Sequence, residues 1–172
     1  DITGNRAYRW SDAGGFQDLG SLGSNNSSGL GISADGNVIV GSSYDGAGRL
    51  RAMRWTSEGG MQSLGQLDDD EVSASAYATS GDGALAVGIG HVLVGDIADP
   101  GLPSGFRWDE TTGLVSVEEW LRQSGVTISD GSTYTARATN CDGSVVVGST
   151  FPVRAGPFLR SDLYIARGNG TG

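Results

Sequence analysis

The chain has 172 residues, a net charge of −9, and 11 basic residues that are all arginine. This composition excludes binding through a nucleic-acid backbone, which requires a basic surface, and it excludes chemistry that depends on a reactive lysine. The single cysteine, Cys141, excludes an internal disulfide, and no apolar stretch approaches the ~20 residues that span a bilayer.

The first recurring pattern is Ala-x-Arg-Trp, followed by a glycine-containing turn and a strand that usually ends in Leu-Gly. Side chains alternate along a strand, so the aromatic residues take one face and the arginine takes the other. The four copies, the last of them degenerate, are Ala7–Gly20, Ala52–Gly65, Gly105–Val115 and Gly156–Ile165. The tryptophans, which we expect to pack between units, are Trp10, Trp55 and Trp108. The arginines, which we expect to pair with turn carboxylates or carbonyls, are Arg9, Arg54 and Arg107.

The second pattern is a strand, an x-Asp-Gly turn and a β-branched strand that ends in Val-Gly. Asp-Gly between two extended runs is a strong signal for a β-hairpin with a type I′ turn. The copies are Ser33–Gly41, Ser80–Gly88 and Asn140–Gly148. Their aspartates, which turn chemistry alone explains, are Asp35, Asp82 and Asp142.

Two successive hairpins make a four-stranded antiparallel unit of the size of a propeller blade. The predicted fold is therefore all-β, a β-propeller-like array, with a β-solenoid as the alternative. The seven hairpins make about three and a half blades, so we expect an excerpt of a longer protein; edge-to-edge association of copies would also supply the missing half. The predicted organisation is a single repeat domain, 1–172, with a half unit 1–26 and units 27–71, 72–132 and 133–172.

Two insertions, 91–104 and 116–125, interrupt the unit 72–132. The second predicts a short helix, because Ser116 and Glu119 form a capping box and Gly125 suits the residue after the helix end. The residues that would share one helix face and dock on the array are Val117, Trp120 and Leu121.

No arrangement of residues predicts an active site, a cofactor or a metal centre. His91 is the only histidine and no Gly-x-Ser-x-Gly motif is present, which leaves a Ser-His-Asp triad without support. The run Asp68–Glu71 lacks EF-hand spacing, so we expect a solvated acidic loop, and calcium binding there stays open. Cys141 replaces Ala34 and Gly81 at a turn, which indicates a small structural residue.

The tight turns and the variable connections separate onto opposite edges of the array. In an up-and-down meander the Asp-Gly and Gly-Gly turns share one edge, and the other connections share the opposite one. Variation concentrated on one side of a regular scaffold is typical of a binding surface. The variable segments are Ser21–Ser27, Ser42–Leu50, Gln66–Glu71, His91–Ser104 and the helical insertion. The residues predicted to contact a partner are Tyr44, Asp45, Asp68, Asp69, Asp70, Glu71, His91, Asp96 and Asp99.

The combined motifs resemble the bacterial extracellular HAF-type repeats, whose units read like Ala-Phe-Arg-Trp, Gly-Gly-Met-x-x-Leu-Gly and Ser-x-Asp-Gly-x-Val-Val-Val-Gly. Ala52–Gly65 and Ser33–Gly41 carry this resemblance, whereas residues 89–104 depart from it. The segments that are similar to the last unit before the membrane barrel of an autotransporter are Phe106–Leu121, Asp142–Gly148 and Tyr164–Gly168. The resemblance implies a secreted or surface-displayed passenger segment of a Gram-negative bacterium, and it implies no catalysis.

These observations predict a non-enzymatic β-repeat domain that mediates adhesion to, or interaction with, a protein or glycan on a cell surface. The first alternative is a structural spacer without a ligand of its own. The second is a secreted glycoside hydrolase, because a carboxylate pair requires only geometry and not proximity in sequence. Nucleic acid is not expected as a partner, no cofactor is expected, and the segment is not expected to be embedded in a membrane.

Overall fold

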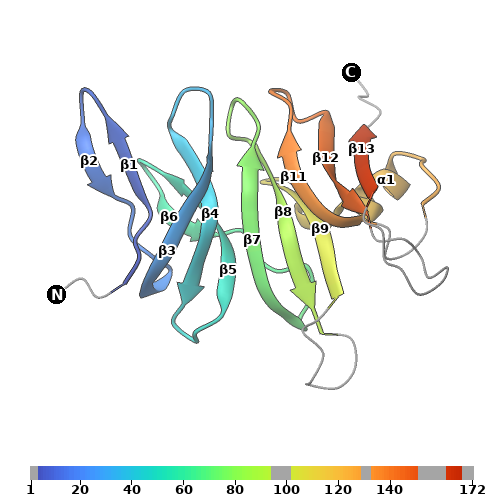
Figure 1. Cartoon of the computed structure of the whole chain (residues 1–172), viewed down its shortest axis with the longest axis horizontal. Coiled ribbons are helices and arrows are strands. Elements are labelled where there is room, and N and C mark those ends of the chain that lie inside the picture. The colour runs from blue at the N-terminus through green and yellow to red at the C-terminus, as the bar shows by residue number, and fades with distance from the viewer. Residues whose placement is uncertain (1–3, 94–101, 129–132, 151–161, 168–172) are drawn as a thin grey trace.

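The computed structural model describes residues 4–93, 102–128, 133–150 and 162–167 (Figure 1). These residues are mostly β, as the sequence predicts. The elements are β1 (Tyr8–Ser11), β2 (Gly15–Asp18), β3 (Gly23–Ile32), β4 (Val38–Asp45), β5 (Leu50–Thr56), β6 (Gly60–Ser63), β7 (Glu71–Thr79), β8 (Leu85–Val92), β9 (Leu102–Asp109), β10 (Gly113–Ser116), α1 (Val117–Gln123), β11 (Thr133–Thr139), β12 (Val145–Thr150) and β13 (Asp162–Arg167).

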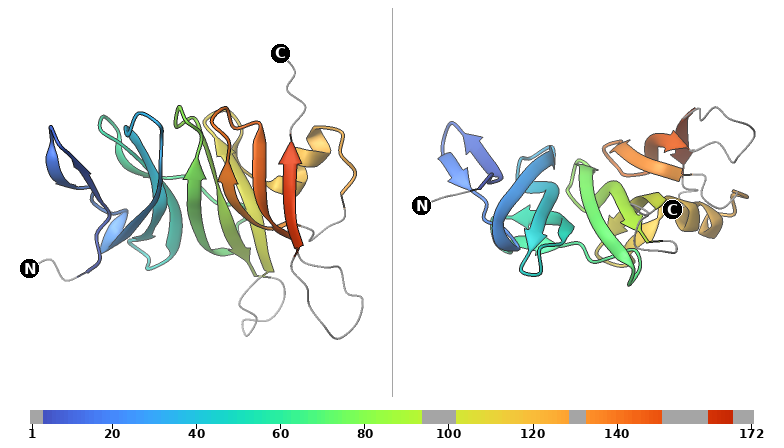
Figure 2. Two further views of the ribbon diagram at one scale, coloured as in Figure 1. Left: turned by 45° about the horizontal axis from the view of Figure 1, so that its top comes forward. Right: turned by 60° about the horizontal axis from the view of Figure 1, so that its bottom comes forward.

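The strands form a row of antiparallel meanders that follow one another along the molecule (Figure 1). The first sheet is the hairpin β1–β2, the second is β3–β6, the third is β7–β10 and the fourth is β11–β13. A single parallel bridge, from Leu50 to Ser73, joins the second and third sheets. The antiparallel pairing contradicts the alternative of a β-solenoid, whose rungs pair in parallel. Within the described residues the row of sheets is open and does not close into a ring (Figure 2).

β4 and β8 are the strands that are covered on both faces. Six successive residues are buried in each, from Val38 to Ser43 and from Leu85 to Gly90. A continuous apolar run suits a strand that is packed from two sides. The cluster between the second and third sheets contains Val40, Ala52, Ala74, Ala76 and Phe106. The core is therefore a series of layers, each shared by two neighbouring sheets.

The Asp-Gly hairpins do not contain the predicted type I′ turns. Among the described residues only glycines have positive φ, so Asp35 does not take the left-handed conformation that type I′ requires. The Gly36 N–H donates to the Ser33 carbonyl (3.0 Å), which closes a type I turn, and Gly36 then has a φ of 74°. The Asp35 carboxylate accepts bonds from the Ser33 hydroxyl (2.6 Å) and the Asn37 N–H (3.0 Å). The prediction is wrong because aspartate serves here as a side-chain acceptor and not as a residue that tolerates positive φ.

Neighbouring sheets also meet through these turns. The Ala34 N–H donates to the Gly81 carbonyl (2.8 Å), and the Gly81 N–H donates to the Cys141 carbonyl (2.7 Å). The three residues occupy the same position, immediately before the aspartate of their turn. They form a turn ladder along one edge of the molecule, the upper edge in Figure 1. Cys141 belongs to the ladder through its backbone, while its thiol is exposed.

α1 begins at the predicted capping residue. The Ser116 hydroxyl accepts a bond from the Glu119 N–H (3.1 Å), and Gly125 has a φ of 80° just beyond the helix. Val117 and Leu121 are buried in a cluster with residues of β8, β11 and β12. The helix therefore packs beside the third and fourth sheets. It does not lie on the edge of variable connections, where it was predicted, because the four-residue β10 leaves its sheet early.

The strand that pairs with β12 does not correspond to the predicted fourth copy of the arginine–tryptophan pattern. Residues 156–160, on which that prediction rested, lie outside the described residues. In the β12–β13 pair Val146 lies opposite Ala166, whereas Ile39 lies opposite Trp55 in the equivalent β4–β5 pair. By register, Ala166 therefore occupies the tryptophan position of the fourth sheet.

The close approach of the turns makes Gly83 intolerant of a side chain. A Cβ atom at Gly83 would lie 2.3 Å from a Val38 methyl carbon, whereas one at Gly113 would meet no atom within 4 Å, although both glycines have positive φ. We expect Gly113→Ala to cost about 1–2 kcal/mol from backbone strain. Gly83→Ala should cost about 1–3 kcal/mol more, because Val38 must move. Urea unfolding of both variants measures this difference, and equal losses would contradict the packing described here.

Candidate binding surface

Two of the repeated arginines, Arg9 and Arg54, connect their own sheet to the next one. The Arg9 guanidinium donates to the Gly36 carbonyl (3.2 Å) and lies over the ring of Trp55, 5.8 Å from its centroid. Arg54 repeats both contacts one sheet further on, with the Gly83 carbonyl (3.3 Å) and the Trp108 ring (5.8 Å). A guanidinium can bond in its plane and stack through its face at the same time.

Arg107 departs from this arrangement because the fourth sheet carries alanine at its tryptophan position. The Arg107 guanidinium lies over Trp120 of α1 (5.5 Å) and pairs with Asp109 of its own strand. Its Nε atom is buried and has no hydrogen-bond partner among the described residues. The helix thus supplies the aromatic ring that the next sheet lacks.

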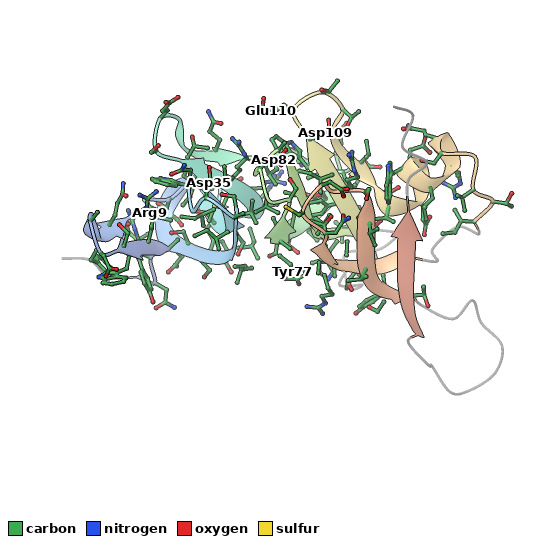
Figure 3. All side chains as sticks on the ribbon, turned by 90° about the horizontal axis from the view of Figure 1, so that it is seen from above. Arg9, Asp35, Tyr77, Asp82, Asp109 and Glu110 are labelled. Carbon is green, nitrogen blue, oxygen red and sulfur yellow. The ribbon has the colours of Figure 1, made fainter. Side chains whose placement is uncertain are left out.

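The aspartates of the second pattern accept hydrogen bonds from residues of their own turns. Figure 3 labels two of them, Asp35 and Asp82. Asp82 accepts bonds from the Ser80 hydroxyl (2.6 Å) and the Ala84 N–H (3.0 Å). Asp142 accepts two bonds from Ser144, one from its hydroxyl and one from its N–H. These hydrogen bonds hold the pKa of each carboxyl below its ordinary value. The repeated residues are therefore occupied in building the array.

Trp10 is not packed between units as predicted. It is 62 % exposed, whereas Trp55 is 4 % exposed. The difference follows from position, because no arginine-bearing sheet precedes β1 in the described residues. Tyr8 and Phe16, whose rings stack at 5.1 Å, are also exposed on this first hairpin.

The variable connections lie at the edge opposite the turn ladder, and we call this the loop edge. It contains the turn 46–49 between β4 and β5, the segment 64–70 between β6 and β7, and the end of β8 at Leu93. The strands extend further than predicted: Tyr44 and Asp45 belong to β4, and His91 belongs to β8. Asp96 and Asp99 lie outside the described residues.

Glu71 is not an exposed carboxylate of the acidic loop, as the sequence suggested. Its side chain is fully buried and pairs with the buried guanidinium of Arg51 (3.4 Å). It also accepts a bond from the Leu67 N–H (2.9 Å). Burial nevertheless raises the pKa of the Glu71 carboxyl, since the lost hydration outweighs these contacts. Arg51 also pairs with Asp45 (3.2 Å). The carboxylates of Asp45 and Glu71 therefore form ion pairs within the loop edge, and neither is free for a partner.

Asp68, Asp69 and Asp70 remain exposed, as predicted for a solvated loop. Asp68 turns the chain by accepting a bond from the Asp70 N–H (3.2 Å). Asp69 and Asp70 line a shallow depression of about 240 Å³ together with Arg49, Val72 and Leu93. This depression brings together the connections of the second and third sheets.

The geometry around His91 gives a triad no further support. Its Nδ1 shares a hydrogen bond with the Ser73 hydroxyl (3.2 Å), and partial burial lowers the pKa of the imidazole. No carboxylate among the described residues bonds to the ring. The described residues also contain no group of three acidic, histidine or cysteine side chains placed to hold a metal ion, and α1 is too short to cross a membrane.

Sequence reasoning missed a row of side chains on the first strand of the second, third and fourth sheets. Leu30, Tyr77 and Arg137 are bulge residues, because the register of their strands shifts by one at each position. Arg137 lies over the Tyr77 ring at 4.7 Å. A large residue between two small ones, five positions before the turn aspartate in all three copies, was the available signal.

Comparison with known proteins gives one structural neighbour to report. No protein-family model matches the sequence, and no curated protein matches it. The chain is similar to the crystal structure of TolB from Acinetobacter baumannii, with a TM-score of 0.52 and 17% identity over 96% of this chain and 35% of that one. TolB is a β-propeller protein, and at this identity the similarity concerns the fold alone.

The buried pair of Arg51 and Glu71 should dominate the stability of the loop edge. Glu71→Ala leaves the Arg51 charge buried beside Asp45 alone, and we expect a loss of about 3–5 kcal/mol. The double variant Arg51→Met/Glu71→Leu should recover most of that loss, since no buried charge remains. Urea unfolding of Glu71→Ala and of the double variant tests this, and a loss in the double variant as large as the loss in Glu71→Ala would show that the unpaired Arg51 charge is not its cause.

Lowered carboxyl pKa values predict the acid sensitivity of the turns. The Asp82 pKa is held below its ordinary 3.8, mainly by the Ser80 hydroxyl, so its stabilising contribution is complete above pH 3.8 and is lost as the pH falls further. We expect Asp82→Asn to flatten the dependence of unfolding free energy on pH in that window. Asp12→Asn is the control, because Asp12 makes no hydrogen bond in the described structure. A variant with the wild-type slope would contradict the assignment.

Proposed function

We propose that this chain is part of a non-enzymatic binding module, a segment of a β-propeller-like array that contacts a ligand on a cell surface through its loop edge. The observation that carries the proposal is the separation of roles within the repeat. The residues that recur, such as Arg54, Trp55 and Asp82, are occupied by contacts between and within sheets. The exposed carboxylates Asp68, Asp69 and Asp70 of a variable connection lie at the opposite edge.

The propeller-like arrangement is supported by two independent features. Each full sheet is a four-stranded antiparallel meander of the size of a blade, and successive sheets share a buried layer. The similarity to TolB extends over nearly the whole chain. In a ring of such sheets the loop edges would form one continuous face, which suits a binding surface assembled from several units.

Export to the surface of a Gram-negative bacterium is proposed from the sequence. The motifs that resemble HAF-type repeats and the last unit of an autotransporter passenger support it, as does the acidic, lysine-free composition. On this view the partner is a protein or a glycan outside the cell.

The loop edge is tested by removing two charges from it. We expect Asp69→Asn/Asp70→Asn to weaken binding of the labelled chain to a panel of host cells by about tenfold, the loss expected for one charge-assisted hydrogen bond. The matched control is Asp12→Asn/Glu58→Gln, which removes two exposed charges from the tight turns at the opposite edge. Protease-treated and periodate-treated cells distinguish a protein partner from a glycan.

Two results would overturn the proposal. Equal binding by both double variants would mean that the acidic part of the loop edge, around Asp69 and Asp70, is not the contact surface. Absence of binding by the wild-type chain to every cell type would favour the spacer, which projects another module and has no ligand of its own. Turnover on a glycan panel that is abolished by replacing one carboxylate would instead favour a hydrolase.

A further inference from the structure

A second depression, of about 260 Å³, lies on the second sheet near the loop edge. It is formed by the lower parts of β3 and β4, the first residue of β5 and the segment before β1. The residues that line it are Asn5, Asn26, Ser27, Ser28, Ser42, Tyr44 and Leu50. Tyr44 is the one residue of this set that the sequence had marked for partner contact.

None of the described side chains that line this depression is charged. The protein carries a net charge of −9, so a neutral lining of this kind is a local departure from its composition. Anions and cations would find no counter-charge here. The lining offers hydroxyl and amide groups with one aromatic ring and one aliphatic side chain.

Several of these polar groups have unused hydrogen-bonding capacity. Ser42 is only 9 % exposed, yet its hydroxyl makes no bond to any described residue. Asn26 uses its Oδ1 atom to accept the Asn5 N–H (3.1 Å), which leaves its two amide N–H donors without a partner among the described residues. The exposed Ser28 hydroxyl is likewise unbonded within the described structure. The Ser42 hydroxyl can therefore both donate a hydrogen bond to a ligand and accept one from it.

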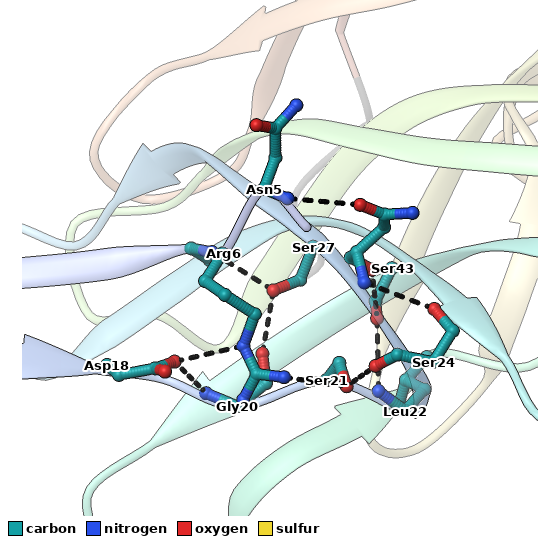
Figure 4. A network of polar contacts seen from close by, with 11 residues as sticks. Asn5, Arg6, Asp18, Gly20, Ser21, Leu22, Ser24, Ser27 and Ser43 are labelled. Carbon is teal, nitrogen blue, oxygen red and sulfur yellow. Dashed lines mark hydrogen bonds and ion pairs between the residues drawn. The ribbon is translucent and has the colours of Figure 1, made fainter. Parts of the chain in front are cut away.

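The backbone beneath the depression is held rigidly by the neighbouring serines (Figure 4). The Ser27 hydroxyl accepts a bond from the Ala7 N–H (3.0 Å) and donates to the Gly20 carbonyl (2.6 Å). The Ser43 hydroxyl accepts a bond from the Leu22 N–H (3.0 Å) and donates to the Asn26 carbonyl (3.1 Å). The Ser27 and Ser43 hydroxyls thus satisfy backbone groups, whereas the hydroxyls of Ser28 and Ser42, one position along each strand, make no bond to any described residue. Rigid support of this kind lowers the entropic cost of binding.

Tyr44 supplies the apolar part of the site. It lies two residues after Ser42 and therefore on the same face of β4. Its side chain is 40 % exposed and stands opposite Leu50 in the strand pair. An aromatic ring beside hydroxyl and amide groups presents both an apolar surface and polar partners.

We propose that this depression is a subsite for a single neutral sugar ring, whose C–H face lies against Tyr44 and whose hydroxyls bond to Ser42, Ser28 and Asn26. The volume falls slightly below the range of about 300–1,000 Å³ typical of sites for small molecules, which favours one ring over a longer ligand. The proposal rests on the proposed function, because it names the class of cell-surface ligand and the part of the loop edge that recognises it.

The test titrates the full chain with methyl glycosides of glucose, galactose, mannose and N-acetylglucosamine, followed by calorimetry or NMR. Saturable binding of at least one of them is expected, and it should not weaken when the salt concentration is raised, because no ion pair is involved. Glucuronic acid serves as the charged comparison and should bind more weakly than the matching neutral sugar.

Variants locate the site. Tyr44→Ala should weaken the binding of the sugar about tenfold and Ser42→Ala about fivefold, as the loss of a stacking surface and of one hydrogen bond implies. Tyr44→Phe keeps the ring and should bind within about twofold of the wild type. Tyr8→Ala, which removes an exposed tyrosine from the first hairpin, should leave affinity unchanged.

The inference and the proposed function fail in different ways. If no neutral sugar binds saturably, or if Tyr44→Ala and Ser42→Ala both bind like the wild type, the subsite is overturned while binding to cells can still stand. If sugars bind at this site but the chain binds no cell, the subsite stands and the proposed function fails. Loss of both kinds of binding overturns both.

Discussion

The stacking of the first three sheets depends on one contact, the arginine that a sheet extends into the next. Arg9 and Arg54 each bond to a turn carbonyl in the plane of the guanidinium and stack on a tryptophan through its face. Lysine could make only one of these two contacts well, because its ammonium group has no plane. The chain contains arginine and no lysine, which agrees with an array in which guanidinium groups bridge neighbouring sheets. The spacing set in this way also brings the Asp-Gly turns within hydrogen-bonding distance of each other.

The hairpins, their order and the helix were predictable because each depends on local chemistry. An Asp-Gly turn between β-branched runs is stabilised by hydrogen bonds between residues close in sequence. The same is true of the helix cap, where Ser116 bonds to Glu119. The turn type was not predictable, since aspartate suits two turns for different reasons. The burial of Glu71 was not predictable either, because its partner Arg51 is brought to it only by the pairing of β5 with β7.

The edge of the fold that carries the candidate surfaces was predictable from the sequence, but the residues that form a depression on it were not. Meander parity places the connections on one side from sequence alone, and Tyr44 and the acidic run were marked in this way. The depression beside Ser42 depends on which of two successive serines lies on the outer face of β4, and strand register decides this. The bulges at Leu30, Tyr77 and Arg137 likewise arise from backbone geometry, although they leave a trace in the small residues that flank them.

Trp120 on α1 has a consequence for the order in which the sheets unfold. Arg9 and Arg54 each reach into the following sheet, so those junctions must open before either neighbour unfolds. Arg107 instead closes onto a helix of its own unit, and so this contact does not couple the third sheet to the fourth. Cooperativity between these two sheets therefore depends on the apolar cluster around Val117, on the stacking of Arg137 over Tyr77 and on the last rung of the turn ladder. In a nearest-neighbour description of the array, apolar packing and the stacking of Arg137 on Tyr77 therefore set the coupling between the third and fourth sheets, in place of the repeated arginine.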